Sequence, residues 1–187
     1  VPFMPEAASF SYPFATLQQL AEDVLKHARD KGATASEVDV SEGFGQSVGV
    51  RCDEVETIEF NRDKGVGITV YVGQRKGYAS TSDFSPQALR ETVEAALDIA
   101  RFTAADDCAG LADAVLMAKD CPDLDLYHPW ALTVEDAIET ARRCEQAAFD
   151  ASPLVSNSEG ASVSTQQAHF VSANSLGFMG GYPTSRH

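Results

Sequence analysis

The sequence predicts an α+β fold in which two helices cover an antiparallel sheet. Apolar residues recur with the 3.6-residue period of a helix near both ends of the first hundred residues. Between these helices, over residues 36–82, the period changes to two, which is typical of strands with one covered face. The connections between the strands are short, and short connections join antiparallel neighbours because a parallel crossover needs about a dozen residues. Together these elements span roughly residues 15–105, enough for a self-sufficient α+β domain.

The first helix is predicted to begin at Thr16. Thr16 and Gln19 have the spacing of a capping box, and Gly32 can adopt the left-handed conformation that ends a helix. The second helix is predicted from Ser85, an N-cap candidate followed by Pro86 at the first helical position. Its apolar face runs to about residue 103.

Four or five strands are expected between the two helices, because turn-forming residues interrupt the alternation at several places. The expected turns are 42–45, 52–54, 61–65 and 73–77. Gly43 and Gly45 lie in the first of these turns. A dinucleotide-binding loop there would have to open a helix, whereas the alternation continues as a strand, so a hairpin turn is the better interpretation.

The second half of the chain predicts an acidic linker and then the beginning of another unit. Residues 106–129 carry six aspartates and two prolines with little periodicity. A third helix is expected over 133–150, with Thr133 and Asp136 as an approximate capping box. Short alternating segments between residues 155 and 181 indicate strands of a second antiparallel sheet. The predicted domains are therefore an N-terminal α+β domain (1–105), a linker (106–129) and the beginning of an incomplete central domain (130–187).

Composition and charge exclude several classes of protein. The chain has 187 residues, with 14 Lys and Arg against 28 Asp and Glu, and a net charge of −14. A phosphate backbone would be repelled by this surface, so no direct nucleic-acid partner is expected. No segment is apolar enough to predict a membrane partner. The four cysteines form no C-x-x-C pair and are expected to be free thiols, which favours a cytoplasmic location.

No local motif predicts catalysis or metal binding in this chain. The sequence lacks a P-loop and a G-x-S-x-G turn. Its four histidines are isolated from one another, and a zinc site needs several convergent ligands. Neither catalytic nor metal-ligating residues are therefore assigned.

Several long segments nevertheless resemble a known family. They comprise the second part of the predicted meander, the stretch before the third helix, and the Asn- and Gly-rich turns near the end of the chain. In order, they are 56–60, 65–81, 123–129, 157–161, 173–178 and 181–187. In sequence and in order they resemble the TldD/PmbA family, and its PmbA-like (TldE) branch most closely.

The resemblance implies that these residues are the N-terminal domain and the beginning of the central region of a protein more than twice as long. Members of this family assemble into a cytoplasmic heterodimeric metalloprotease that degrades or trims unfolded peptides. Family roles include maturation of a peptide antibiotic, antitoxin degradation, and the older label of modulator of DNA gyrase. Zinc lies in a His-Glu-x-x-x-His helix of the TldD-type subunit. The sequence contains no His-Glu pair, so we expect no cofactor in this chain and zinc in a TldD-like partner.

The expected partners are thus a TldD-like subunit or a second copy, together with an unfolded peptide. A peptide can add as an extra strand to a sheet edge, and the strands between residues 155 and 182 are the expected edge. The candidate peptide-binding residues are Asn157, Asn174, Gly177 and Tyr182. The alternative is that these residues only shape hairpins. For the whole chain, two alternatives stay open: a non-catalytic interaction module, or the N-terminal part of a TldD-type zinc peptidase with its metal motif downstream.

Overall fold

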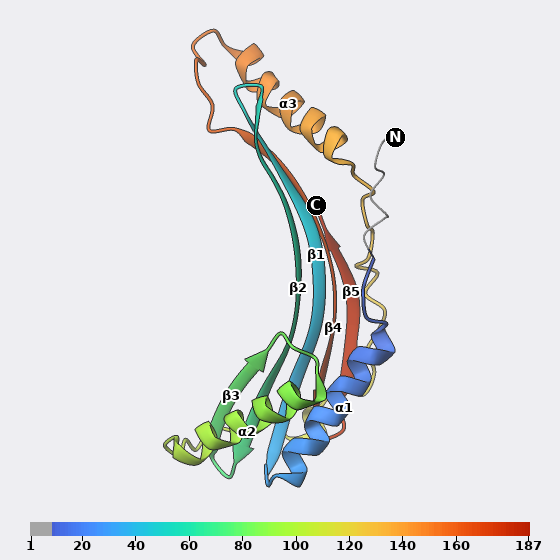
Figure 1. Ribbon diagram of the computed structural model, residues 1–187, viewed down its shortest axis with the longest axis vertical. Helices are drawn as coiled ribbons and strands as arrows, with labels where there is room; N and C mark the ends of the chain where they lie inside the picture. The colour runs from blue at the N-terminus through green and yellow to red at the C-terminus, as the bar shows by residue number, and fades with distance from the viewer. Residues whose placement is uncertain (1–8) are drawn as a thin grey trace. The chain divides into compact units, whose positions relative to one another are not determined.

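The computed structural model describes residues 9–187 and confirms the α+β class (Figure 1). Its five strands form one sheet in the order β3-β2-β1-β4-β5. Three α-helices and a short 3-10 helix accompany the sheet. In chain order the elements are α1 (Phe14–Asp30), β1 (Ala35–Arg51), β2 (Glu54–Val72), β3 (Arg75–Thr81), α2 (Pro86–Phe102), η1 (Ala114–Leu116), α3 (Val134–Ala151), β4 (Ala161–Asn174) and β5 (Met179–Arg186).

Neighbouring strands of the sheet run antiparallel. Strands β2 and β3 pair from Val66 opposite Thr81 to Val72 opposite Arg75. The turns between β1 and β2 and between β4 and β5 are too short for a parallel crossover. Strand β4 runs against β1: its far end lies near the start of β1, where the Ser36 amide donates to Ser175. At the other end of β4, Gly160, the residue before the strand begins, lies against the carbonyl of Val50 near the end of β1.

The described residues fall into two compact units, and strands β1, β2, β4 and β5 contribute to both. Unit 1 contains residues 9–42, 63–124 and 169–182. Unit 2 contains residues 43–62, 125–168 and 183–187. Neither unit is a continuous stretch of chain, because each long strand passes from one unit into the other.

The core of unit 1 lies between the sheet and helices α1 and α2. Figure 1 shows the two helices on the part of the sheet that carries β3. Apolar residues from alternate strand positions and from one face of each helix are buried together there, as the two sequence periods require. The principal members are Leu17, Val24, Val38, Val40, Val66, Ile68, Val70, Val93, Leu97 and Val171. At the surface, an ion pair of 2.7 Å joins Lys31 on α1 to Glu94 on α2.

Unit 2 has fewer buried apolar side chains, and they lie on β1 and α3. Its buried apolar side chains are Phe44, Val48 and Val50 on β1. Ala137 and Ala141 are the buried apolar residues on α3.

Two of the three predicted helix starts are confirmed. The Ser85 hydroxyl accepts from the Ala88 amide at the start of α2, and the Thr133 hydroxyl accepts from the Asp136 amide at the start of α3. The capping box predicted at Thr16 is wrong. Helix α1 already begins at Phe14, and the carbonyl of Pro13 accepts the Thr16 amide at 2.9 Å, so Thr16 lies inside the first turn.

The prediction of four or five strands over residues 36–82 is wrong, because the region contains three. The predicted turns at 42–45 and 61–65 are absent, and β1 and β2 continue through them as strands of 17 and 19 residues. Gly45 is needed because a side chain there would collide with the backbone of β4. In β2, the Arg62 guanidinium lies 4.8 Å from the centre of the Phe44 ring, a contact that favours the extended strand.

The predicted second sheet is also wrong. The strand expected at 155–158 is absent, and the alternating segments after residue 160 form β4 and β5, which join the same sheet as β1–β3. The reason is burial: His169, Val171 and Ala173 alternate along β4 and are all buried in unit 1. Their apolar surroundings are the core beneath α1, so these strands complete the first sheet.

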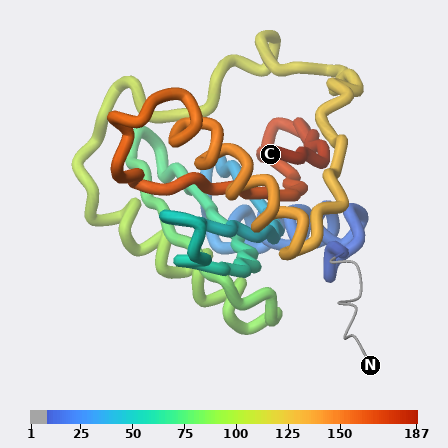
Figure 2. The backbone as a smooth tube through the Cα atoms, turned by 90° about the horizontal axis from the view of Figure 1, so that it is seen from above, coloured from blue at the N-terminus to red at the C-terminus, as the bar shows by residue number. Residues whose placement is uncertain are grey.

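The segment between α2 and α3 is a long connection with little regular structure. Its 3-10 helix η1 spans three residues, and Figure 2 shows the rest as an open loop in yellow-green and yellow. Within residues 9–187, no helix combines the length and apolar character needed to cross a bilayer. The four cysteines are free thiols, as predicted.

Gly77 on β3 provides a test of the packing of α2 on the sheet. A Cβ atom at this position would meet the backbone of Ala96 and Ala100. We expect Gly77→Ala to lower the free energy of unfolding by about 1–3 kcal/mol, because the helix backbone would have to shift. Urea unfolding followed by circular dichroism measures this loss.

The matched control for that substitution is Gly110→Ala, where a Cβ atom would have no heavy atom within 4 Å. We expect its free energy of unfolding to stay within about 0.5 kcal/mol of wild type. An equal loss in both variants would contradict the close approach of α2 to β3.

Candidate peptide-binding site

The four candidate residues from the sequence lie in different surroundings. Asn174 and Gly177 share the turn between β4 and β5, and Tyr182 lies on β5. Asn157 belongs to unit 2, in the loop between α3 and β4, where its side-chain oxygen is 3.7 Å from the Cys52 sulfur. The structure therefore brings Asn174 and Gly177 together.

Asn174 organises the turn that it occupies. Its side-chain oxygen accepts from the amides of Leu176 and Phe178, and its own amide donates to the Phe178 carbonyl. Gly177 has a φ of +91°, a conformation that side chains rarely adopt. Tyr182 packs edge-on against Phe170, with 4.7 Å between ring centres. These contacts give the three residues a role in shaping the hairpin.

The outer edge of β5 is partly covered. The Ser185 amide donates to the Leu126 carbonyl at 2.9 Å, and the Ser185 hydroxyl accepts from the His128 amide at 2.7 Å. Pro183 has no amide hydrogen to offer to an added strand. An incoming peptide would therefore have to displace the segment that already pairs with this edge.

No described strand pairs with the outer edge of β2 along most of its length. Strand β3 pairs with β2 only from Val66 to Val72. Since β2 begins at Glu54, no described strand lies beside the outer edge of residues 54–65. Residues 54–63 are all exposed, including Phe60 at 68% and Ile58 at 47%. We call residues 54–62, which all belong to unit 2, the open β2 edge.

A buried glutamate holds the turn at the beginning of the open β2 edge. Glu145 on α3 accepts from the amides of Cys52 and Asp53, at 2.8 and 2.9 Å. Both turn residues have positive φ, so their amides point together at one carboxylate. Hydrogen bonds from the Asp53 amide, the Ser158 side chain and the Cys52 amide lower the pKa of Glu145. Arg142 adds an ion pair to Asp53 at 3.2 Å.

A second buried glutamate, Glu42 in unit 1, holds the segment that leads into α1. Its carboxylate accepts from the amides of Ser11 and Tyr12 at 2.8–3.0 Å. His169 lies 3.6 Å from the same carboxylate, and Phe10 stacks on its ring. Burial lowers the pKa of His169, although the Glu42 carboxylate opposes that shift, so the ring is neutral at pH 7. These contacts attach the start of α1 to the sheet.

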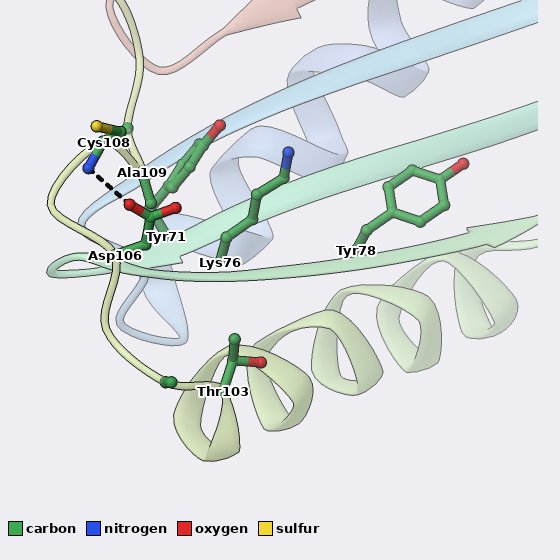
Figure 3. Close-up of a pocket in the computed structure, with 9 residues that line it drawn as sticks. Tyr71, Lys76, Tyr78, Thr103, Asp106, Cys108 and Ala109 are labelled. Carbon is green, nitrogen blue, oxygen red and sulfur yellow. Dashed lines mark hydrogen bonds between the residues drawn. The ribbon is translucent and has the colours of Figure 1, made fainter.

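An open pocket of about 540 Å³ lies in unit 1, between the strands and the segment that follows α2. Figure 3 shows the residues that line it. Tyr71, Lys76 and Tyr78 line it from the strands, and Asp106 accepts from the Cys108 amide at its rim. The Tyr71 hydroxyl donates to Glu37 at 2.9 Å. Burial, together with Glu37, raises the pKa of Tyr71 to about 12, so this group stays protonated at neutral pH and cannot act as a base.

The described residues do not form a metal site. Within 9–187, no three His, Cys, Asp or Glu side chains converge in a way that could hold an ion. The ring of His128, for example, contacts the carboxylate and carbonyl of a single acidic residue, Asp125. The residues present therefore do not fit zinc, and no hydrolytic step is derived for this chain.

Sequence reasoning missed the open β2 edge and both buried glutamates. The sequence carried only a short signal for the edge, the alternation of Ile58 and Phe60 ahead of the residues that β3 pairs with. Glu42 and Glu145 carried no local signal, because each binds amides that are 30 or more positions away in the chain.

Two family models match the chain in succession. The PmbA/TldA metallopeptidase domain 1 matches residues 36–100. The PmbA/TldA metallopeptidase central domain matches residues 127–187. Together the two matches cover the sheet, α2 and α3.

Curated relatives align with nearly the whole chain. It is 48% identical to Metalloprotease PmbA of Escherichia coli O157:H7 over 171 residues, which cover 91% of this chain and 38% of that protein. It is 46% identical to the Metalloprotease PmbA homolog of Haemophilus influenzae with the same coverage. The chain therefore spans less than two fifths of the length of these relatives.

Solved structures share the fold. A Bacteroides thetaiotaomicron protein named as a candidate modulator of DNA gyrase superposes with a TM-score of 0.74 at 25% identity, covering 90% of this chain and 38% of its own. TldE from Thermococcus kodakarensis superposes with a TM-score of 0.71 at 15% identity, covering 89% and 37%. The second likeness concerns the fold alone.

Glu145 provides a test of how the hairpin turn is held. In Glu145→Gln we expect the Cys52 and Asp53 amides to exchange with solvent about tenfold faster, because a neutral amide is a weaker acceptor than a carboxylate. The lowered pKa also sets a pH dependence. The contribution of the carboxylate to stability is present above its ordinary value of 4.5 and is lost as the pH falls through the lower folded-state value.

Amide exchange measured by NMR from pH 3 to 7 checks both expectations. Glu139→Gln, on the exposed side of the same helix, is the matched control and should leave the two amides unchanged. Unaltered exchange in Glu145→Gln would show that the turn does not depend on this carboxylate.

Proposed function

Because this chain belongs to the PmbA/TldD metallopeptidase family, we propose that it is the N-terminal part of a PmbA-like (TldE) subunit in a metalloprotease complex that hydrolyses or trims unfolded peptides. One observation carries the proposal: 171 residues, drawn from both matched domains, align at 48% identity with Metalloprotease PmbA of Escherichia coli. We extend the family roles to the parent protein, which would act in the cytoplasm. These roles are peptide maturation, antitoxin degradation and an effect on DNA gyrase.

Within such a complex this chain would supply surface for the substrate and the partner. The zinc would belong to a TldD-like subunit, since a His-Glu-x-x-x-His helix has no counterpart in these 187 residues. When bound there, zinc would lower the pKa of a water molecule and so generate the nucleophile. The contribution of this chain would be contact with an extended substrate or with the partner, and the open β2 edge has the exposure that such contact requires.

Reconstitution tests the proposal. The full-length parent, its TldD-like partner and their mixture are each incubated with an unfolded fluorogenic peptide, with and without a zinc chelator. We expect zinc-dependent cleavage in the mixture and none with the parent alone, because one subunit holds the metal and the other completes the complex.

A matched control replaces the glutamate of the partner's His-Glu-x-x-x-His motif with glutamine, which should abolish cleavage without preventing assembly. Zinc-dependent cleavage by the parent alone would identify a TldD-type peptidase instead. Cleavage that does not change when the parent is added would identify an interaction module with no part in proteolysis.

A further inference from the structure

The open β2 edge has hydrogen-bonding groups directed away from the sheet. Val72 and Arg75 flank a two-residue turn, so they form a hydrogen-bonded pair, and such pairs alternate along antiparallel strands. Over the paired part of β2, the even-numbered residues therefore direct their backbone groups toward the β3 side. Along residues 54–62 the backbone groups of alternate residues likewise point outward, where no described strand receives them.

The side chains at this edge would also suit an added strand. Ile58 and Phe60 are two positions apart and therefore share one face of the sheet, with 47% and 68% of their surfaces exposed. Val55 is 39% exposed. On an added strand, the residues directly opposite Ile58 and Phe60 would gain most by being apolar.

The charge of the open β2 edge indicates which kind of strand could bind beside it. Within the open β2 edge there are three acidic side chains, Glu54, Glu56 and Glu59, against the single basic Arg62. The whole chain carries −14. A second copy would bring a like-charged edge on a like-charged surface. A cationic segment would be attracted both by the acidic side chains of the edge and by the net charge of the whole chain.

We propose that the open β2 edge binds an extended peptide segment in which basic and apolar residues alternate, added to the sheet as a sixth strand. Backbone hydrogen bonds to the edge would give affinity without strict sequence preference. The alternation would place apolar side chains on the face of Ile58 and Phe60, and basic ones on the opposite face, which carries Glu59. This assignment rests on the proposed function and names the class of substrate and the strand that receives it.

Direct binding to the 187-residue chain tests the assignment. The probe is a nine-residue fluorescein-labelled peptide of alternating Lys and Val, measured by fluorescence anisotropy at 50 and 300 mM salt. Two matched probes replace Lys with Glu, or carry N-methyl groups on alternate amides. We expect the first probe to bind at least about tenfold more tightly than either of the others, and to weaken as salt rises.

Substitutions locate the binding on the strand. Phe60→Lys should weaken the Lys-Val probe by about tenfold or more, because it removes an apolar contact and adds a repulsive charge. Phe102→Lys on α2, where the side chain is 90% exposed, is the matched control and should bind as wild type does. Glu56→Lys combined with Glu59→Lys should shift the preference toward the Glu-Val probe. Circular dichroism of each variant verifies that the sheet is retained.

Three outcomes would overturn the proposal. They are equal binding of the N-methylated probe, equal binding by Phe60→Lys with its fold intact, or self-association of the chain through this edge in sedimentation. These measurements need neither zinc nor partner. A failure of peptide cleavage in the reconstituted complex would therefore count against the proposed function and not against this edge.

Discussion

Backbone hydrogen bonding between β1 and its neighbours β2 and β4 is the constraint on which the rest of the structure depends. Strands of globular proteins are usually about 3–10 residues long, whereas β1 and β2 have 17 and 19. Every amide and carbonyl along them needs a partner or water. Glycines in β1 allow the neighbouring backbone to approach closely enough to supply one, as at Gly45. The length of these strands is also the reason that each compact unit contains part of the same sheet.

The two buried glutamates meet the same requirement for backbone amides that lie outside the strands. Glu145 accepts the amides of Cys52 and Asp53 at the hairpin turn of unit 2, and Glu42 accepts the amides of Ser11 and Tyr12 before α1 in unit 1. A carboxylate has enough acceptor positions to bind two such donors, and charge strengthens each bond. In each unit, a glutamate side chain thus supplies the acceptor that these backbone amides need.

The edges of the sheet differ because they are protected by different means. Backbone pairing with the linker covers part of β5, where Pro183 also lacks a donor. Acidic side chains accompany β2 where β3 no longer reaches it, and charge of this kind discourages pairing with other acidic or apolar strands. Ile58 and Phe60 stay exposed among these charged side chains. An edge of this kind discriminates between partners by their charge.

The sequence by itself determined the α+β class, the approximate positions of all three helices, the caps at Ser85 and Thr133, and the family resemblance. These depend on periodicity and short-range hydrogen bonds, which are local properties. The tertiary structure alone decided that Gly43 and Gly45 continue a strand, that the segments after residue 160 join the first sheet, and which edge stays open. Each of these depends on what lies across the sheet, many residues away in the chain. Glycine is as suitable for close backbone approach as for turns, so its sequence positions do not distinguish the two.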